Sequence, residues 1–230
     1  MDSFLDKLHE TSIVDDRWKY LVDGLKTTLI ITVFAVMIGM VLGFLVAIIR
    51  STHDRTGKLK ILNLFCKLYL TVIRGTPVMV QLLIIYYVIF ASVRIDKTFV
   101  GILAFGINSG AYVAEIVRSG IMSIDKGQFE AGASLGLNYT KTMKYIIMPQ
   151  AFKNVLPALA NECIVLLKET SVAGYIALAD LTKGGDIIRS ITYEPFLPLI
   201  AVALIYLVIV VGLSALVGKL ERRLKKSDRG

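Results

Sequence analysis

Long apolar runs separated by short polar segments dominate the pattern of the chain. A helix needs about 20 apolar residues to cross roughly 30 Å of hydrocarbon. The run from Leu29 to Ile49 has that length and contains no charged residue. The pattern as a whole predicts five such helices, at about residues 25–50, 61–93, 98–119, 153–179 and 196–220. We therefore expect an all-α integral membrane protein.

Two local features concern the first two of these spans. Gly39 and Gly43 have the GxxxG spacing that permits close helix approach, but glycine is common in membrane helices and we attribute the spacing to chance. Pro77 lies near the middle of the second run and removes a backbone donor, so we expect this span to be tilted or kinked. Lys67 and Arg74 lie in its first half, from which they can snorkel to the nearer side.

The polar segments between the runs define the rest of the organisation. Residues 1–19 are polar and mildly acidic and lack the basic start of a cleaved signal peptide, so the first span is expected to be an uncleaved anchor. Residues 120–150 form the one long stretch without a spanning run, and residues 223–230 form a basic tail. We expect residues 20–222 to form a single transmembrane domain.

Composition agrees with a membrane protein, because 55% of the 230 residues are hydrophobic and only 19% are charged, whereas a soluble domain has roughly 25% charged residues. The net charge of +8 does not indicate a nucleic-acid partner, since the basic residues lie at the ends of apolar runs and are not interleaved with aromatic ones. With five spans, one side of the membrane carries 15 Lys and Arg residues and the other carries 8. The positive-inside rule then predicts an external N-terminus and a cytoplasmic C-terminus.

Several other kinds of site are not indicated. Cys66 and Cys163 each lie in an apolar run and are interpreted as small buried hydrophobes, with no metal-ligand spacing. His9 and His53 both lie in polar segments, which argues against a buried histidine proton relay. There is no GxxxxGK[ST] motif, so the chain is not expected to bind ATP in that way.

Polar side chains recur along one face of two of the spans. Those of the third span are Asn108, Tyr112, Glu115 and Ser119, with Ser109 beside them. Those of the fourth span are Asn161, Glu162, Lys168 and Glu169. An ionisable residue at bilayer depth costs about 2.5–3.5 kcal/mol or more, so each needs a partner or a water-filled cavity. Any one of them could hold helices together by hydrogen bonds, but jointly the two stripes predict a polar pathway.

Glu162 is the most informative of these positions, because it lies well inside the fourth span and far from any loop. It could bind an ammonium or guanidinium group of a ligand. Alternatively, it could be neutralised by Arg74 or Lys168.

The loop at residues 130–149 reads EAGASLGLNYTKTMKYIIMP and predicts two short helices, at 128–135 and 139–148. Gly136 suits a helix end with positive φ, and Asn138 can cap the helix that follows. A short helix with small residues on one side suits docking into another protein. It could also lie on the membrane as an interfacial helical hairpin.

This loop resembles the EAA motif of the permease subunits of bacterial ABC importers. The residues at the spacing of the motif are Glu130, Ala131, Gly136, Ile146, Met148 and Pro149. The residue type departs from the motif at two positions, with Gly132 in place of Ala and Met148 in place of Leu. Three more segments resemble the polar amino-acid (histidine, arginine, lysine and glutamine) permeases, namely RGTPxxxQ at 74–81, NSGAY at 108–112, and the segment at 161–171. The resemblance extends from about residue 24 to residue 220.

The resemblance implies the type I ABC importer architecture in the bacterial plasma (inner) membrane. It implies a dimer of permease chains, for which we expect a homodimer, two cytoplasmic ATPase subunits and an extracytoplasmic amino-acid-binding protein. ATP and Mg²⁺ would bind to the ATPase, so this chain is expected to bind no cofactor and not to be an enzyme. The residues that would couple to the ATPase are Glu130, Ala131, Gly132, Gly136 and Pro149.

Together, the stripes and the resemblance predict a permease that moves a polar amino acid, basic or glutamine-like, inward by alternating access. Ser109 and Tyr112 are expected to contact its α-amino and α-carboxylate groups, and Glu162 its amino group or a cationic side chain. The other expected pathway residues are Asn108, Glu115 and Asn161, with Gln81, Tyr86 and Tyr87 at the wall. Two alternatives remain: an ion-coupled carrier without an ATPase, using Glu115, Glu162 and Glu169 as proton sites, and a structural membrane scaffold.

Overall fold

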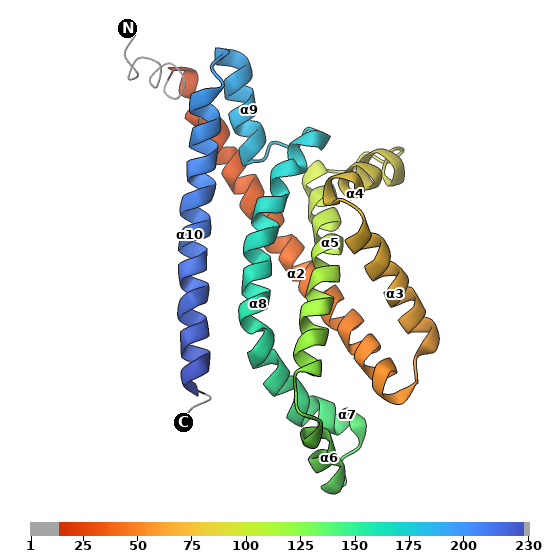
Figure 1. Cartoon of the computed structure of the whole chain (residues 1–230). Coiled ribbons are helices and arrows are strands. Elements are labelled where there is room, and N and C mark those ends of the chain that lie inside the picture. Colours follow the sequence, from red (N-terminus) through yellow and green to blue (C-terminus); the bar gives the residue numbers. More distant parts are fainter. Residues whose placement is uncertain (1–13, 228–230) are drawn as a thin grey trace.

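The computed structural model describes residues 14–227, and every regular element in that range is helical (Figure 1). The longer helices are α2 (Trp18–Thr56), α3 (Lys60–Gly75), α5 (Lys97–Met122), α8 (Met148–Glu169), α9 (Leu181–Thr192) and α10 (Phe196–Ser227). The shorter ones are η1 (Val14–Asp16), α4 (Val78–Ile84), η2 (Ile85–Ile89), α6 (Lys126–Ser134), α7 (Tyr139–Thr142), η3 (Met143–Ile147) and η4 (Thr170–Ile176). Most of the expected N-terminal segment and the last residues of the basic tail lie outside the described range.

Three helices are long and apolar enough to cross a membrane, and they lie within Val14–Thr56, Lys97–Met122 and Phe196–Leu224. The pair Lys60–Gly75 and Val78–Ile89 makes a fourth candidate if its two parts are counted as one span. The expected fourth span, at 153–179, does not meet this criterion in the described residues. The physical reason is the polar content of α8, which ends at Glu169 before a short 3-10 segment.

The expected kink in the second span is a complete break, because the two helices of the pair meet at an angle of 109°. Thr76 and Pro77 have extended backbone conformations between them, as expected for a proline and the residue before it. The side-chain amide of Gln81 donates to the carbonyl oxygens of Ile73, at 2.7 Å, and Thr76, at 3.0 Å. It thereby satisfies carbonyl groups that the end of α3 leaves without helical partners.

The helix expected at 139–148 and the span expected from 153 form one uninterrupted helical run. It passes from α7 through the π-helical turn η3 into α8, so it extends from Tyr139 to Glu169. Pro149 is the second residue of α8 and directly follows the π-helical turn η3, and the helical run continues through it. The loop that faces the predicted cytoplasmic side is therefore continuous with the helix that carries Glu162.

Close packing of α2 against α5 forms the centre of the fold. A Cβ atom at Gly43 would lie 2.4 Å from Cγ1 of Val113, and one at Gly39 would lie 2.9 Å from Oγ of Ser109. The attribution of this glycine spacing to chance was therefore wrong. The missing side chains let α5 approach the backbone of α2, as in other close helix pairs.

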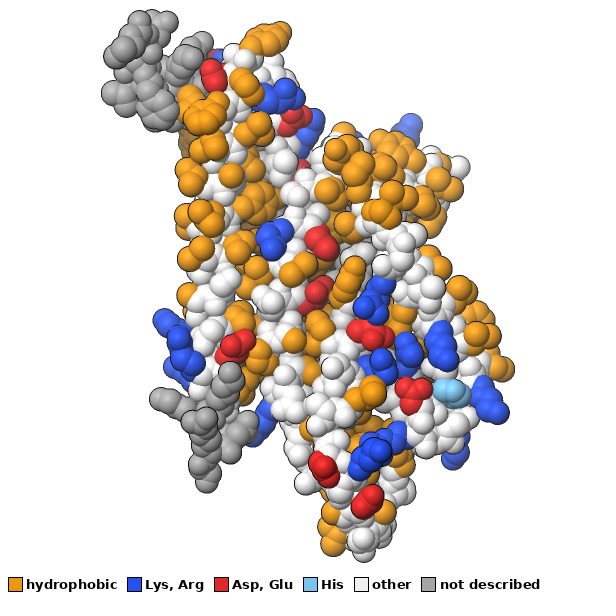
Figure 2. Space-filling model, in the orientation of Figure 1, with side chains coloured by type: hydrophobic (Ala, Val, Ile, Leu, Met, Phe, Trp, Pro, Cys, Tyr) orange, Lys and Arg blue, Asp and Glu red, His pale blue; other side chains and the backbone are white. Residues whose placement is uncertain are grey.

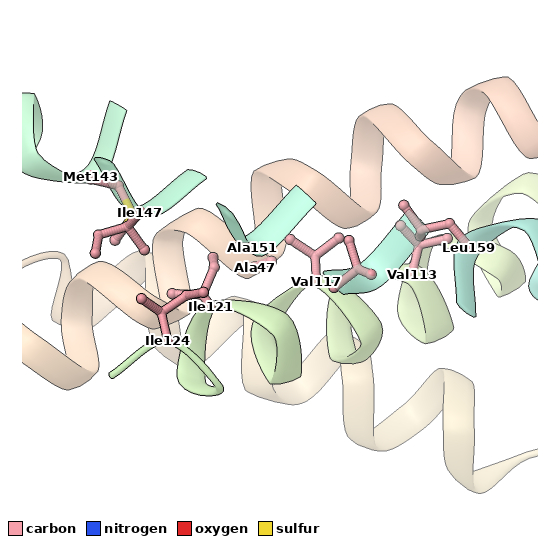
Figure 3. Packing of buried hydrophobic residues seen from close by; sticks show 10 residues of the cluster. Ala47, Val113, Val117, Ile121, Ile124, Met143, Ile147, Ala151 and Leu159 are labelled. Carbon is pink, nitrogen blue, oxygen red and sulfur yellow. The ribbon is translucent and has the colours of Figure 1, made fainter. Parts of the chain in front are cut away.

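The main hydrophobic cluster lies where α2, α5 and the α7–α8 run meet (Figure 3). Its buried members include Ala47 from α2, Val117 and Ile121 from α5, and Ile147 and Ala151 from the η3–α8 segment. This cluster connects the short helices α6 and α7 to the body of the protein.

The two ends of the molecule carry different elements. The α2–α3 turn, α6, α7 and the C-terminal end of α10 lie at one end, whereas α9 and the start of α2 lie at the other (Figure 1). The first end contains the segments that gave the larger Lys and Arg count.

Candidate functional site

Helices α5 and α8 meet through a hydrogen bond between the two predicted polar stripes. The Ser109 hydroxyl donates to Oε1 of Glu162 at 3.2 Å, across 53 residues of sequence. Ser109 is buried, with 1% of its surface exposed, whereas Glu162 is only partly buried and can reach a ligand. Within residues 14–227, no cationic side chain lies within ion-pair distance of Glu162, so neither Arg74 nor Lys168 neutralises it. The stripes thus provide a partly buried acid that has no protein counterion in the described chain.

Asn108 and Gln81 form a second link from the same face of α5. Asn108 donates from Nδ2 to Oε1 of Gln81 at 3.0 Å, and both side chains are buried. The amide of Gln81 also holds the end of α3. In this conformation the pair therefore fixes the α3–α4 break to α5 and is not exposed on an open pathway.

Tyr112 and Glu115 follow Ser109 along α5 toward the end of the molecule that carries α6 and α7. Tyr112 is 36% exposed, and the guanidinium of Arg74 lies 5.8 Å from the centre of its ring. Glu115 lies within 3.4 Å of Arg50 and Arg118 and within 3.8 Å of Arg74. Glu115 is therefore surrounded by guanidinium groups, unlike Glu162.

The sequence did not reveal this arginine cluster. Arg50 and Arg118 contributed only to the total of 15 Lys and Arg residues on one side, and Arg74 was considered as a snorkelling side chain or a counterion for Glu162. The contact between Arg50 and Glu115 joins positions 65 residues apart, and no local spacing signals a pairing at that separation. The only available sign was that several cations border the same spans.

The remaining pathway candidates are dispersed. Asn161 is exposed on α8 beside Glu162. Tyr86 and Tyr87 lie in the π-helical segment η2, with ring centroids 4.8 Å apart, and line a different cavity of about 660 Å³ together with Arg94. The structure therefore does not bring these two tyrosines together with Ser109 and Glu162.

Helices α6 and α7 form a compact hairpin at the end of the molecule. The expected turn chemistry is confirmed, because Gly136 has φ of +73° and the Asn138 side chain accepts the N–H of Lys141 at 3.0 Å. Glu130 and Ala131 are exposed, and so is Pro149 at the start of α8. These positions are accessible to a partner protein.

Gly132 differs from the other expected coupling residues because it is buried. A Cβ atom there would lie 2.6 Å from Cγ2 of Thr142, on the facing helix α7. Its small size therefore permits packing within the hairpin, and its expected role in coupling to the ATPase stays a prediction. This contact also explains why glycine replaces the alanine of the usual motif.

The hairpin is also attached to the end of α2. The guanidinium of Arg55 lies over the ring of Phe129 at 3.5 Å from its centroid, a geometry in which the ring attracts the cation.

The two cysteines are both free, Cys66 being buried and Cys163 partly buried.

Comparison with known proteins identifies the class to which this fold and these motifs belong. The family model described as "Binding-protein-dependent transport system inner membrane component" matches residues 39–226. The chain belongs to this family. It is therefore a multi-pass membrane component of a transport system.

Relatives of the chain are amino-acid permeases by name. It is 38% identical over 207 to 211 residues to the arginine transport system permease protein ArtQ of Bacillus subtilis and to a Rickettsia bellii relative named for glutamine transport. It is also 38% identical to the glutamine transport system permease protein GlnP of Escherichia coli K12 over 208 residues. These alignments cover 89–91% of this chain and 93–94% of the relatives.

Solved structures agree with these relationships. A crystal structure described as an amino acid ABC transporter with histidines superposes with a TM-score of 0.83 and 42% identity, covering 96% of this chain and 98% of that one. The MetNI methionine ABC transporter, in an inward-facing conformation, has the same fold with a TM-score of 0.78 at 18% identity, covering 92% and 99% of the two chains. The alternative of a carrier that works without an ATPase finds no support in these similarities.

Proposed function

We propose that the chain is the translocation subunit of an ATP-driven importer of a polar amino acid, basic or glutamine-like. The relatives named for arginine and glutamine transport support this substrate class. The substrate's amino group or cationic side chain binds Glu162, and Ser109 positions that carboxylate through its hydrogen bond. Hydrolysis of ATP takes place on a separate subunit, and alternating access exposes the site first to one side of the membrane and then to the other.

One observation carries the proposal: Glu162 on α8 meets Ser109 on α5, is partly accessible, and has no cation near it in the described residues. An isolated carboxylate at this depth is costly unless it binds something of opposite charge. A substrate ammonium or guanidinium group supplies that charge for the time it is bound.

The hairpin of α6 and α7 is proposed to dock on the ATPase. Glu130 and Ala131 are exposed on α6, and the hairpin is joined directly to α8 through the η3 turn. A movement of the hairpin is therefore transmitted to the helix that carries Glu162 without crossing a flexible linker. Arg55 and Phe129 connect the same hairpin to α2.

The proposed orientation places the α6–α7 hairpin and the C-terminus in the cytoplasm and the N-terminus outside. The larger Lys and Arg count of the segments at that end supports it. We propose further that two copies of the chain pair in the membrane and that an extracytoplasmic binding protein delivers the amino acid.

The substrate site is tested with Glu162→Gln in the complete transporter, reconstituted into proteoliposomes with its ATPase and binding protein. We expect uptake of labelled L-arginine or L-glutamine to fall at least tenfold while assembly of the complex is retained. Glu162→Asp keeps the charge and should retain part of the activity. Glu221→Gln removes a carboxylate near the end of α10 and serves as the matched control. Wild-type uptake by Glu162→Gln would exclude this residue from the site.

The docking assignment is tested separately with Glu130→Arg on the exposed side of α6. ATP hydrolysis by the assembled complex should lose its stimulation by substrate-loaded binding protein, whereas insertion into the membrane is unchanged. Thr140→Ala, an exposed change on α7, is the control. Stimulated hydrolysis at the wild-type level in Glu130→Arg would contradict the assignment.

A further inference from the structure

A basic cavity lies beside the candidate substrate site, between α2, α3 and α5. Its volume is about 620 Å³, and its lining includes Arg50, Lys67, Arg74, Tyr112 and Glu115. Cavities of roughly 300–1,000 Å³ accommodate small-molecule ligands. Figure 2 shows Lys and Arg side chains gathered around acidic ones in this part of the molecule.

The ion pairs around this cavity are shared and long. Glu115 has three arginines at 3.4–3.8 Å, whereas a charge-assisted hydrogen bond is about 2.7–2.9 Å long. Among the described residues, the network contains one other acid, Asp54, which lies 3.8 Å from Arg118. The carboxylate of Glu115 is therefore shared among three guanidinium groups, and none of these three contacts is short.

The cations of the cavity also outnumber its acids. Lys67 has no acidic side chain within ion-pair distance in residues 14–227. The side chains of Arg50 and Arg74 line the cavity together with Lys67. Guanidinium groups present several donors in a planar fork that matches a carboxylate. The cavity thus has donors and positive charge available for an anionic group.

Its position connects the cavity with the substrate site. Ser109, Tyr112 and Glu115 follow one another on α5, and at 1.5 Å per residue Glu115 lies about 9 Å beyond Ser109 along the helix. This displacement is toward the end that carries α6 and α7. Because Glu115 lies among the arginines, the cavity carries both negative and positive charge. Such a cavity suits a ligand with both an ammonium and a carboxylate group and disfavours a simple lipid phosphate.

We propose that this cavity is a carboxylate-binding station for the amino acid on the cytoplasmic side of Glu162. The arginines and Lys67 bind the α-carboxylate, and Glu115 faces the ammonium group. The station rests on the proposed function, because it concerns the same substrate after it leaves Glu162. It gives the transporter a preference for amino acids over their amides, which lack the carboxylate charge.

The test compares an amino acid with its amide, which lacks the carboxylate charge. Equilibrium binding to the complete transporter is measured in phosphatidylcholine nanodiscs with L-arginine and L-argininamide, or with the glutamine pair if the wild type takes up glutamine. We expect the double variant Lys67→Gln/Arg74→Gln to lose about tenfold of the acid-over-amide preference. Arg74→Lys keeps the positive charge but not the planar guanidinium group, so it should lose less of this preference.

Two further variants separate the possible failures. Lys60→Gln removes a positive charge from α3 outside the cavity and should leave the preference unchanged. Glu162→Gln should weaken binding of the amino acid and binding of its amide equally. If it does not, the result counts against Glu162 as the substrate site and not against the station. An unchanged preference in the folded double variant would overturn the station. A change that occurs only when phosphatidylglycerol is present would also overturn it, because it would identify a lipid phosphate as the ligand.

Discussion

Helices α2 and α10 have equally apolar windows but very different surroundings. Both windows have a mean hydropathy of 2.9, yet 33% of the α2 window is buried in the protein, compared with 6% of the α10 window. The least apolar candidate span, α5, has a mean hydropathy of 1.5 and is 67% buried. Figure 1 shows the corresponding arrangement, with α10 at the side and α5 among the other helices.

The difference shows that hydropathy alone does not distinguish a helix surface that packs against protein from one that protein leaves uncovered. Lipid tails are as apolar as leucine, so association between membrane helices depends on close packing and hydrogen bonds. α2 and α5 provide both through small residues and buried polar side chains. Paired substitutions in the buried helices and in α10 test this contrast.

The largest effect is expected from removing a buried aromatic ring. Phe105 on α5 is fully buried, whereas Leu207 on α10 is 56% exposed. Phe105→Ala should lower the free energy of unfolding by about 3 kcal/mol or more, because the ring leaves a cavity. Leu207→Ala should change it by about 0.5 kcal/mol or less. Unfolding in mixed micelles measures both, and equal losses would contradict the assignment of α10 to the lipid-facing side.

A glycine-to-alanine substitution should have opposite effects on stability in α2 and in α10. Gly43→Ala places a Cβ atom against Val113, whereas a Cβ at Gly212 on α10 meets nothing within 4 Å. Gly43→Ala should cost about 2 kcal/mol through overpacking. Gly212→Ala should stabilise α10 by up to about 1 kcal/mol through helix propensity. Val113→Ala in the Gly43→Ala background should restore part of the loss, and no rescue would argue against direct packing.

A buried hydroxyl on α2 should contribute less than either packing change. The Thr28 oxygen accepts the N–H of Leu181 at 3.1 Å, and Thr28 is fully buried. Thr28→Val keeps the shape but leaves that N–H without an acceptor, so we expect a loss of about 1–2 kcal/mol in thermal unfolding. Ser214→Ala, at an exposed position on α10, is the control. An equally large loss of stability in Ser214→Ala would show no difference between the buried hydroxyl of Thr28 and an exposed hydroxyl.

The smallest effect concerns pH and helix α9, which contacts both α2 and α10. Hydrogen bonds from Lys183 and then from Arg189 lower the pKa of Asp186 below its usual value. Stability from a lowered carboxyl pKa is present above the unfolded pKa of about 3.9 and is lost as pH falls through the folded pKa. Because Asp186 is 34% exposed, solvent screening limits the contribution to about 0.5 kcal/mol or less.

Asp186→Asn should therefore be slightly less stable than the wild type at pH 7. As the pH falls below about 4, the difference between the two melting temperatures should shrink, because protonation of the Asp186 carboxyl weakens its interactions with Lys183 and Arg189. A wild-type protein whose extra stability persists unchanged at pH 3 would show that the ion pairs are not its source.

Local features of the hairpin were predictable from the sequence, and long-range features of the spans were not. Gly136 and Asn138 determine the conformation of adjacent residues, so their roles could be predicted from spacing alone. The packing of Gly132 could not be predicted in the same way, because its constraint comes from Thr142 on the facing helix. The attribution of the glycine pair on α2 to chance was wrong for the same reason, since only Val113 and Ser109 on α5 show its use.

Polar positions within the spans show the same division. The helical spacing of the stripes correctly placed Ser109 and Glu162 on helix faces, but not the hydrogen bond that joins them. Pro77 predicted a kink, but the 109° break depends on an amide that reaches back from the next helix. The roles of the stripes in binding a substrate remain predictions.

By itself, the sequence determined the apolar lengths, the imbalance of Lys and Arg between the two sides, and the local capping of the hairpin. Each of these depends on residues close together in the chain. Only the tertiary structure decided that Ser109 meets Glu162, 53 residues away, and that Arg50 meets Glu115, 65 residues away. The physical reason is that a helix specifies which face a side chain occupies, whereas packing between helices specifies which faces meet.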